Sequence, residues 1–211
     1  MTNPYGDIEL GPRSMRALAH PVRLAILSRL QGHGPSTATA LAPLVGATPS
    51  VTSWHLRHLA QHGLVRDADV ESDGRQRWWE AAGTGIRFTP SGAGEEQAAA
   101  ALLSRVMFEQ AAGLPEQWVR DTEPLLEPEW RRSAGLSNTT VVITADELAE
   151  VEAAVEELLA PYVLRKARGE AEEGARRVRL LRYVLPSAPA ATDSDADGPG
   201  KEPGDEPGDA T

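Results

Sequence analysis

Apolar residues in the first third of the chain recur at helical spacing, and prolines and glycines divide them into short segments. Residues 12–19 predict a short helix, and Pro21 is placed to begin a second one, with apolar positions through Leu30. Gly32 and Gly34 are expected to end that second helix. The pattern therefore predicts two short amphipathic helices that pack against each other.

Two further helices are predicted before residue 63. Thr37 can cap the third, but Pro43 lies inside it, where proline costs up to about 3 kcal/mol or kinks the helix. We therefore expect the third helix to be short or distorted. Thr48 can cap the fourth helix, with Pro49 at its first position.

A β-hairpin is predicted directly after the fourth helix. Residues 64–66 favour a strand, residues 71–74 a turn, and residues 76–81 a returning strand that contains two tryptophans. A helix, a tight turn, a second helix and then a hairpin is the order of a winged helix-turn-helix.

The fourth helix, residues 48–62, separates an aliphatic side from a polar side. At 100° per residue, Thr52, Leu56 and Leu59 share one face, together with Thr48. The helix contains no acidic residue, and arginine and serine are side chains that read base edges or phosphates in the major groove. The polar side consists of Ser50, Ser53, Trp54, Arg57, His58 and Gln61.

A polar helix face can also be merely solvated, and a winged helix can serve as a protein-interaction module that does not bind DNA. The preceding helix-and-turn and the following hairpin favour DNA recognition over a solvated face. The interaction module remains an alternative.

Two sequence segments resemble the ArsR-type winged-helix regulators. They are LAHPVRLAILSRL (residues 18–30) and TPSVTSWHLRHLAQHGLV (residues 48–65). The segment GRQRWWEAAG (residues 74–83) is similar to the wing of an actinobacterial-type branch of that family. The resemblance covers about residues 12–90.

The resemblance implies a homodimer whose recognition helices enter successive major grooves, about 34 Å apart, on a palindromic operator. It also favours a repressor over an activator. It places His55 near the DNA backbone and two wing arginines at phosphates or in the minor groove, although ordinary hairpin solvation would also account for these arginines. The predicted DNA-binding residues are Thr48, Ser50, Ser53, Trp54, His55, Arg57, His58, Arg75 and Arg77.

We predict no metal, cofactor or catalytic residue. The chain has no cysteine, and the predicted third helix, TATALAPLV, carries no metal ligand. His55, His58 and His62 follow an i, i+3, i+7 spacing that could present imidazoles to zinc. They lie on or beside the proposed reading surface, however, where contact with phosphate or packing at a helix edge is the favoured interpretation.

Residues 95–112 predict a helix. The resemblance implies that this helix pairs two subunits, because helices after the wing do so in that family, and packing on its own domain is the alternative. The predicted dimer contacts are Leu18, Leu102, Leu103 and Val106. Trp118 and Trp130 flank a proline-broken segment and either cover a core or line a pocket.

A small α+β module is predicted after residue 138. Residues 139–143 favour a strand, residues 144–147 form a capping box for a helix, and residues 177–185 favour a second strand. The glutamates of this helix indicate a solvated face rather than acid catalysis, because no nucleophile or histidine accompanies them. The module is expected either to hold a dimer together or to receive a small-molecule effector. A metabolite receptor is therefore a second alternative function.

Charge is distributed unevenly along the chain. Its formal net charge is -10, yet residues 1–90 carry nine arginines against seven acids. The fold class is thus mainly α with small β: an N-terminal arm (1–11), a winged helix-turn-helix domain (12–90), a dimerisation or effector module (91–186) and a disordered acidic tail (187–211). No apolar run reaches the roughly 20 residues of a membrane span, and residues 1–10 lack a signal-peptide core, so we expect a cytoplasmic protein.

Overall fold

The first two helices form where the sequence places them. The computed structural model describes residues 3, 5–70, 76–88, 93–170 and 172–188. Helix α1 spans Pro12–Leu18 and α2 spans Pro21–His33, so each begins at a proline. Helix α2 ends at Gly34, whose φ of 83° is a conformation that glycine adopts without steric cost. His33, which lies between the two glycines expected to end this helix, is its last residue.

The proline inside the third helix has the expected effect. Helix α3 is only four residues long, Ala38–Leu41, and the chain tightens into a 3₁₀ turn, η1, over Ala42–Leu44. After a turn at Gly46, helix α4 runs over Pro49–Gln61. The α3–turn–α4 unit is thus the predicted helix-turn-helix, with its first helix cut short by Pro43.

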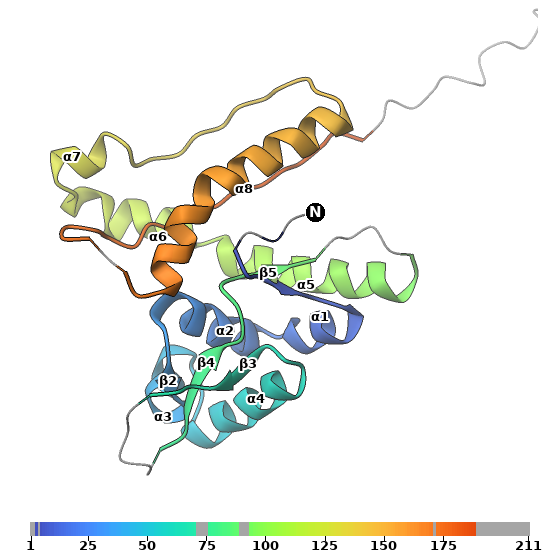
Figure 1. Cartoon of the computed structure of the whole chain (residues 1–211), viewed down its shortest axis with the longest axis vertical. Coiled ribbons are helices and arrows are strands. Elements are labelled where there is room, and N and C mark those ends of the chain that lie inside the picture. The colour runs from blue at the N-terminus through green and yellow to red at the C-terminus, as the bar shows by residue number, and fades with distance from the viewer. Residues whose placement is uncertain (1–2, 4, 71–75, 89–92, 171, 189–211) are drawn as a thin grey trace, which may run out of the picture. The chain divides into compact units, whose positions relative to one another are not determined.

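The predicted hairpin is present and gains a third strand. Strands β3 (Val65–Asp67) and β4 (Trp78–Ala81) are antiparallel, and β2 (Ser36–Thr37) pairs with the other edge of β4. Strand β2 directly precedes α3, so the sheet anchors the start of the helix-turn-helix to the wing (Figure 1). The predicted turn at residues 71–74 lies outside the described residues, as does Arg75.

A second, parallel pair of strands was not predicted. Strand β1 (Ile8–Glu9) lies beside β5 (Ile86–Arg87), so the N-terminal arm is paired to the chain that leaves the wing. The two segments approach closely at Gly83, where an added Cβ would lie 2.6 Å from the carbonyl oxygen of Gly6. Two-residue strands give little sequence signal, because pairing rather than propensity creates them.

One hydrophobic core joins the winged region to helix α5 (Glu95–Ala111). Helix α5 packs on α1 and contributes four buried residues, Ala99, Ala100, Leu103 and Val106. Arg87 of β5 makes ion pairs with Asp7 (3.8 Å) and with Glu156 (2.8 Å). Among the described residues, the core and the apolar side chains packed against it extend from Ile8 to Met107 and no further.

Prolines begin the short helices that follow α5. Helix α6 spans Leu114–Asp121, a 3₁₀ turn η2 covers Glu123–Leu125, and α7 spans Pro128–Arg131, each with a proline in its first turn. None of these elements has a buried residue. The sequence correctly excluded a long helix here.

The predicted C-terminal helix forms, but the strands on either side of it do not. Helix α8 runs over Ala145–Ala167 and begins with the predicted capping box, in which Glu147 N donates to Thr144 Oγ1 (3.2 Å) and Thr144 N donates to Glu147 Oε2 (2.7 Å). The strand predictions for residues 139–143 and 177–185 were wrong, because neither segment pairs with a strand within the described part of the chain. β-Branched composition supplies propensity, but a strand also needs a hydrogen-bonded neighbour.

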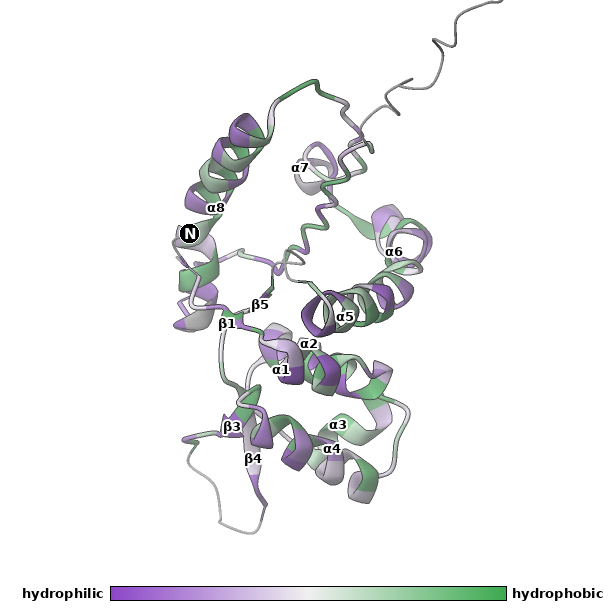
Figure 2. Ribbon diagram, turned by 90° about the vertical axis from the view of Figure 1, so that its right-hand side faces the viewer, coloured by the Kyte–Doolittle hydropathy of each residue, from purple (hydrophilic) through white to green (hydrophobic). Residues whose placement is uncertain are grey.

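None of the helices in the described ranges is both long and apolar enough to cross a membrane. Helix α8 has sufficient length, but hydrophilic patches interrupt the hydrophobic ones along it (Figure 2).

Candidate nucleic-acid interface

Helix α4 is held in the domain by its aliphatic side. Thr52, Leu56 and Leu59 are fully buried, as the helical spacing predicts. The Thr48 side chain caps the helix by accepting a hydrogen bond from Val51 N (3.3 Å), and the Thr52 hydroxyl donates to the Thr48 carbonyl (2.9 Å). Capping and burial together fix the rotation of α4 about its axis, and thereby the side that faces solvent.

The opposite side of α4 is a polar surface without acidic residues. Ser50, Trp54, Arg57 and Gln61 are exposed, as predicted, and 53% of the Trp54 surface remains accessible. Arg57 Nη1 donates to Ser53 Oγ (3.1 Å), so one turn of the helix orders the guanidinium. A cation and hydroxyl donors on one exposed ridge suit a partner rich in acceptor atoms.

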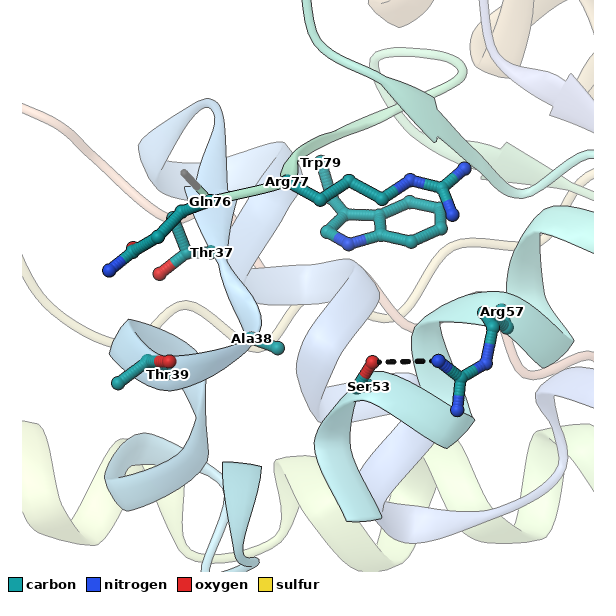
Figure 3. Close-up of a pocket in the computed structure, with 8 residues that line it drawn as sticks. All are labelled: Thr37, Ala38, Thr39, Ser53, Arg57, Gln76, Arg77 and Trp79. Carbon is teal, nitrogen blue, oxygen red and sulfur yellow. Dashed lines mark hydrogen bonds between the residues drawn. The ribbon is translucent and has the colours of Figure 1, made fainter. Parts of the chain in front are cut away.

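A notch of about 190 Å³ lies between α4, the start of α3 and the wing (Figure 3). Ser53 and Arg57 border it from α4, and Arg77 lies opposite them on the chain entering β4. Three other polar lining residues, Thr37, Thr39 and Gln76, were not among the predicted site residues. Their convergence is a tertiary property, because they come from two segments far apart in the sequence.

Arg77 is ordered by two neighbours. Its Nε and Nη2 atoms donate to the two carboxylate oxygens of Asp67 (2.5 and 2.9 Å), and the guanidinium lies 4.0 Å from the centre of the Trp79 ring. The hydrogen bonds with Asp67 raise the pKa of Arg77, and those with Arg77 lower the pKa of Asp67. A phosphate that approached Arg77 would therefore compete with Asp67.

His55, which the family resemblance placed near the DNA backbone, is instead a buried residue. Only 5% of it is exposed, its ring lies 4.9 Å from that of His20, and its Nδ1 atom has no hydrogen-bond partner among the described residues. The helical wheel explains this position, since residue 55 lies beside the inward face. Burial lowers the pKa of His55, and the charges of His20, Arg23 and His58 lower it further.

His58 and His62 continue a row of ring contacts along α4. His58 is half-buried, stacks on Trp54 (5.7 Å between ring centres) and lies 4.9 Å from His62. Burial lowers the pKa of both His58 and His20. No group of three or more metal-ligating side chains arranged to hold an ion occurs in the part of the chain that the structure describes.

The four predicted dimer residues separate into two groups. Leu18, Leu103 and Val106 are buried in the protomer's own core, which is the alternative use that the sequence left open. Leu102 is 48% exposed on α5. Leu102 is thus the member of the four that presents substantial surface to a second subunit.

The described elements define a winged helix-turn-helix domain in a mostly helical chain with small sheets. Residues 18–68 match the family described as a helix-turn-helix domain. A curated relative, the HTH-type transcriptional regulator YgaV of Escherichia coli, is 39% identical over 57 residues. That segment is 26% of this chain and spans 58% of the relative's length.

Solved structures give weaker global matches. One is the homodimeric winged helix-turn-helix DNA-binding domain Mb0332 of Mycobacterium bovis, described as a possible ArsR-family regulator; it is 24% identical and covers 48% of this chain and 79% of its own, with a TM-score of 0.30. Another is a transcriptional regulator homologue from Pyrococcus horikoshii, 23% identical over 48% of this chain and 93% of its own, with a TM-score of 0.30. At such scores, the winged fold is established by this chain's own elements.

Proposed function

We propose that this chain is a sequence-specific regulator of transcription that binds double-stranded DNA. It binds an inverted-repeat operator as a homodimer and represses transcription from it. Helix α4 reads bases in the major groove, while Arg77 of the wing contacts the backbone beside it. Such a regulator acts in the cytoplasm and carries no catalytic site.

The outward face of α4 carries this proposal. A helix of 13 residues is about 20 Å long and fits the major groove. Its aliphatic side is fully buried and its exposed side contains Ser50, Trp54 and Arg57 with no carboxylate. A ridge without carboxylates suits DNA, because no acidic side chain on it repels the phosphates. Each contact between a basic side chain and a phosphate adds affinity through counterion release.

Dimerisation follows from the size of one reading unit. A single α4 contacts one half-site, and a two-fold dimer places two such helices about 34 Å apart on a palindrome. Helix α5 offers exposed apolar side chains for this contact, with Leu102 at 48% and Phe108 at 50% exposure.

The proposal is tested by selecting bound sequences from a random duplex pool. We expect an inverted repeat, and the logarithm of affinity for it should fall linearly with the logarithm of salt concentration. Failure to enrich any sequence, together with a flat salt response, would favour a protein-interaction module and overturn the proposal.

Arg57→Ala distinguishes base reading from simple charge attraction. If Arg57 donates to guanine, the variant loses about 1–3 kcal/mol on the selected operator and relaxes preference at one position. Arg120→Ala is the matched control, because it removes the same charge as Arg57→Ala. Arg120 is exposed on α6 and pairs locally with Asp121. Equal losses on operator and random DNA would assign Arg57 to phosphate only.

A further inference from the structure

Helix α8 carries an apolar seam with the spacing of a coiled coil. Leu148, Val151, Val155, Leu158 and Tyr162 are separated by alternating steps of three and four residues. This 3.5-residue period keeps a stripe on one side of a helix and is the pattern by which two helices pack side by side. Pro161 lies inside α8 but is not a seam position.

Within the described part of the protomer, the seam is only partly covered. Val151, Leu158 and Tyr162 are 49%, 69% and 60% exposed, and Leu148 and Val155 are only half-buried. Arg165 lies over the outer part of Tyr162, 5.5 Å from its ring centre, and leaves that ring largely accessible. No residue of α8 belongs to the hydrophobic core of the described chain.

Charge along α8 changes sign from one end to the other. The first part of the helix is acidic and the last turn is basic, an arrangement that also suits the helix dipole. Two α8 helices in parallel would place like charges together, whereas antiparallel helices place the acidic first turn of each, with Asp146 and Glu147, beside the basic last turn of the other. The acids are Asp146, Glu147, Glu150, Glu152, Glu156 and Glu157, and the bases are Arg165, Lys166 and the adjoining Arg168.

We propose that the occupant of the α8 seam is α8 of a second copy of this chain, bound antiparallel. The seam has the periodicity that a helix would pack against, and the acidic first turn and basic last turn of α8 are complementary when two copies run in opposite directions. In the register that aligns the two stripes, Val155 lies opposite Leu158 of the partner subunit, and the two-fold axis passes between residues 156 and 157. This surface is separate from the operator-reading face of α4 and from α5.

Nitroxide labels test both the pairing and its direction. The chain contains no cysteine, so Glu157→Cys and Ala149→Cys each give one labelled site per protomer. At 1.5 Å per residue, antiparallel pairing separates the two 157 labels by about 1.5 Å along the axis and the two 149 labels by about 22 Å. With equal lateral offsets, the mean distance by pulsed dipolar spectroscopy should therefore be about 10 Å longer for 149 than for 157.

A seam variant and a matched surface variant separate α8 pairing from dimerisation elsewhere. Leu158→Glu adds a charge to the seam, and Ala153→Glu adds the same charge to an exposed position outside it. We expect Leu158→Glu to abolish the short 157 distance and Ala153→Glu to preserve it, with circular dichroism confirming that both variants fold.

Equal distances at 149 and 157, no dipolar coupling at 157, or a 157 distance unaffected by Leu158→Glu would each overturn the proposal. The measurements use the full chain without DNA, so their outcome is independent of operator binding.

Discussion

Most large apolar side chains in the first part of the described chain are buried, whereas many similar side chains further along remain at the surface. From Ile8 to Met107 they build one core around α4 and α5, in which Leu56 and Leu103 have no accessible surface. Beyond residue 107, Leu125 is 80% exposed and Val142 is fully exposed. Both regions contain apolar side chains, but they differ in whether other parts of the same chain bury those side chains.

The difference shows what a hydrophobic pattern specifies. A helical or alternating pattern identifies the side of an element that is costly to leave in water. It does not identify what covers that side. In the winged region several amphipathic elements close on one another, and α8 instead presents a seam suited to an identical helix.

The largest expected effect contrasts a buried leucine of the first region with an exposed leucine of the second. Leu56→Ala removes a fully buried side chain from α4 and should lower the free energy of unfolding by about 2–5 kcal/mol. Leu125→Ala, at an 80% exposed position, should change it by no more than about 0.5 kcal/mol. Urea unfolding followed by circular dichroism measures both, and similar losses would contradict the contrast.

Helix capping provides a medium-sized test. Thr48 and Thr144 each cap a helix through their hydroxyl oxygen, and replacing such a residue by alanine costs about 0.5–2 kcal/mol. Thr48→Ala should therefore lower global stability, because α4 unfolds with the core. Thr144→Ala should instead accelerate amide exchange within α8 and leave global unfolding nearly unchanged.

Serine substitutions at the same two positions are the controls, because serine retains the capping oxygen. If Thr144→Ala lowered global stability as much as Thr48→Ala, α8 would belong to the same cooperative unit as the core.

The smallest expected effect is a loss of folding stability on acidification. Burial lowers the pKa values of His20, His55 and His58 below the ordinary value of about 6.5, so the unfolded chain binds protons more readily than the folded one. The contribution of these histidines to the free energy of unfolding is fully present above a pH of about 6.5 and decreases as the pH falls below that value. The charged neighbours acting on the rings, Arg23 and other histidines, reinforce this direction.

His20→Asn isolates part of this pH dependence. His20 Nδ1 accepts the hydrogen bond from Val22 N (3.2 Å) that caps α2, and asparagine caps helices well without titrating in this range. The variant should keep its stability near pH 7.5 and lose less of it at pH 5 than the parent chain. An unchanged slope of unfolding free energy against pH would exclude His20 as a contributor.

Much of helix α4 was predictable from local sequence. Thr48 and Pro49 mark its start, and the spacing of Thr52, Leu56 and Leu59 identifies its buried side. His55 lies beside the inward face, buried against His20, and its place near the DNA backbone stays a prediction from the resemblance. The notch was not predictable as a unit, since it needs β2–β4 pairing to bring Thr37 and Gln76 toward α4.

Local sequence specifies where the helices of the winged region begin, which proline shortens α3, which side of α4 is buried and where α8 is capped. These are local properties, set by backbone restriction, capping groups and side-chain periodicity. Tertiary contacts are what pair the N-terminal arm with β5 and bury Leu18 and Leu103 in the protomer's own core. They also leave residues 139–143 and 177–185 outside the sheets of the described part of the chain. Each of those outcomes depends on which distant segment is available as a partner, and short-range patterns do not contain that information.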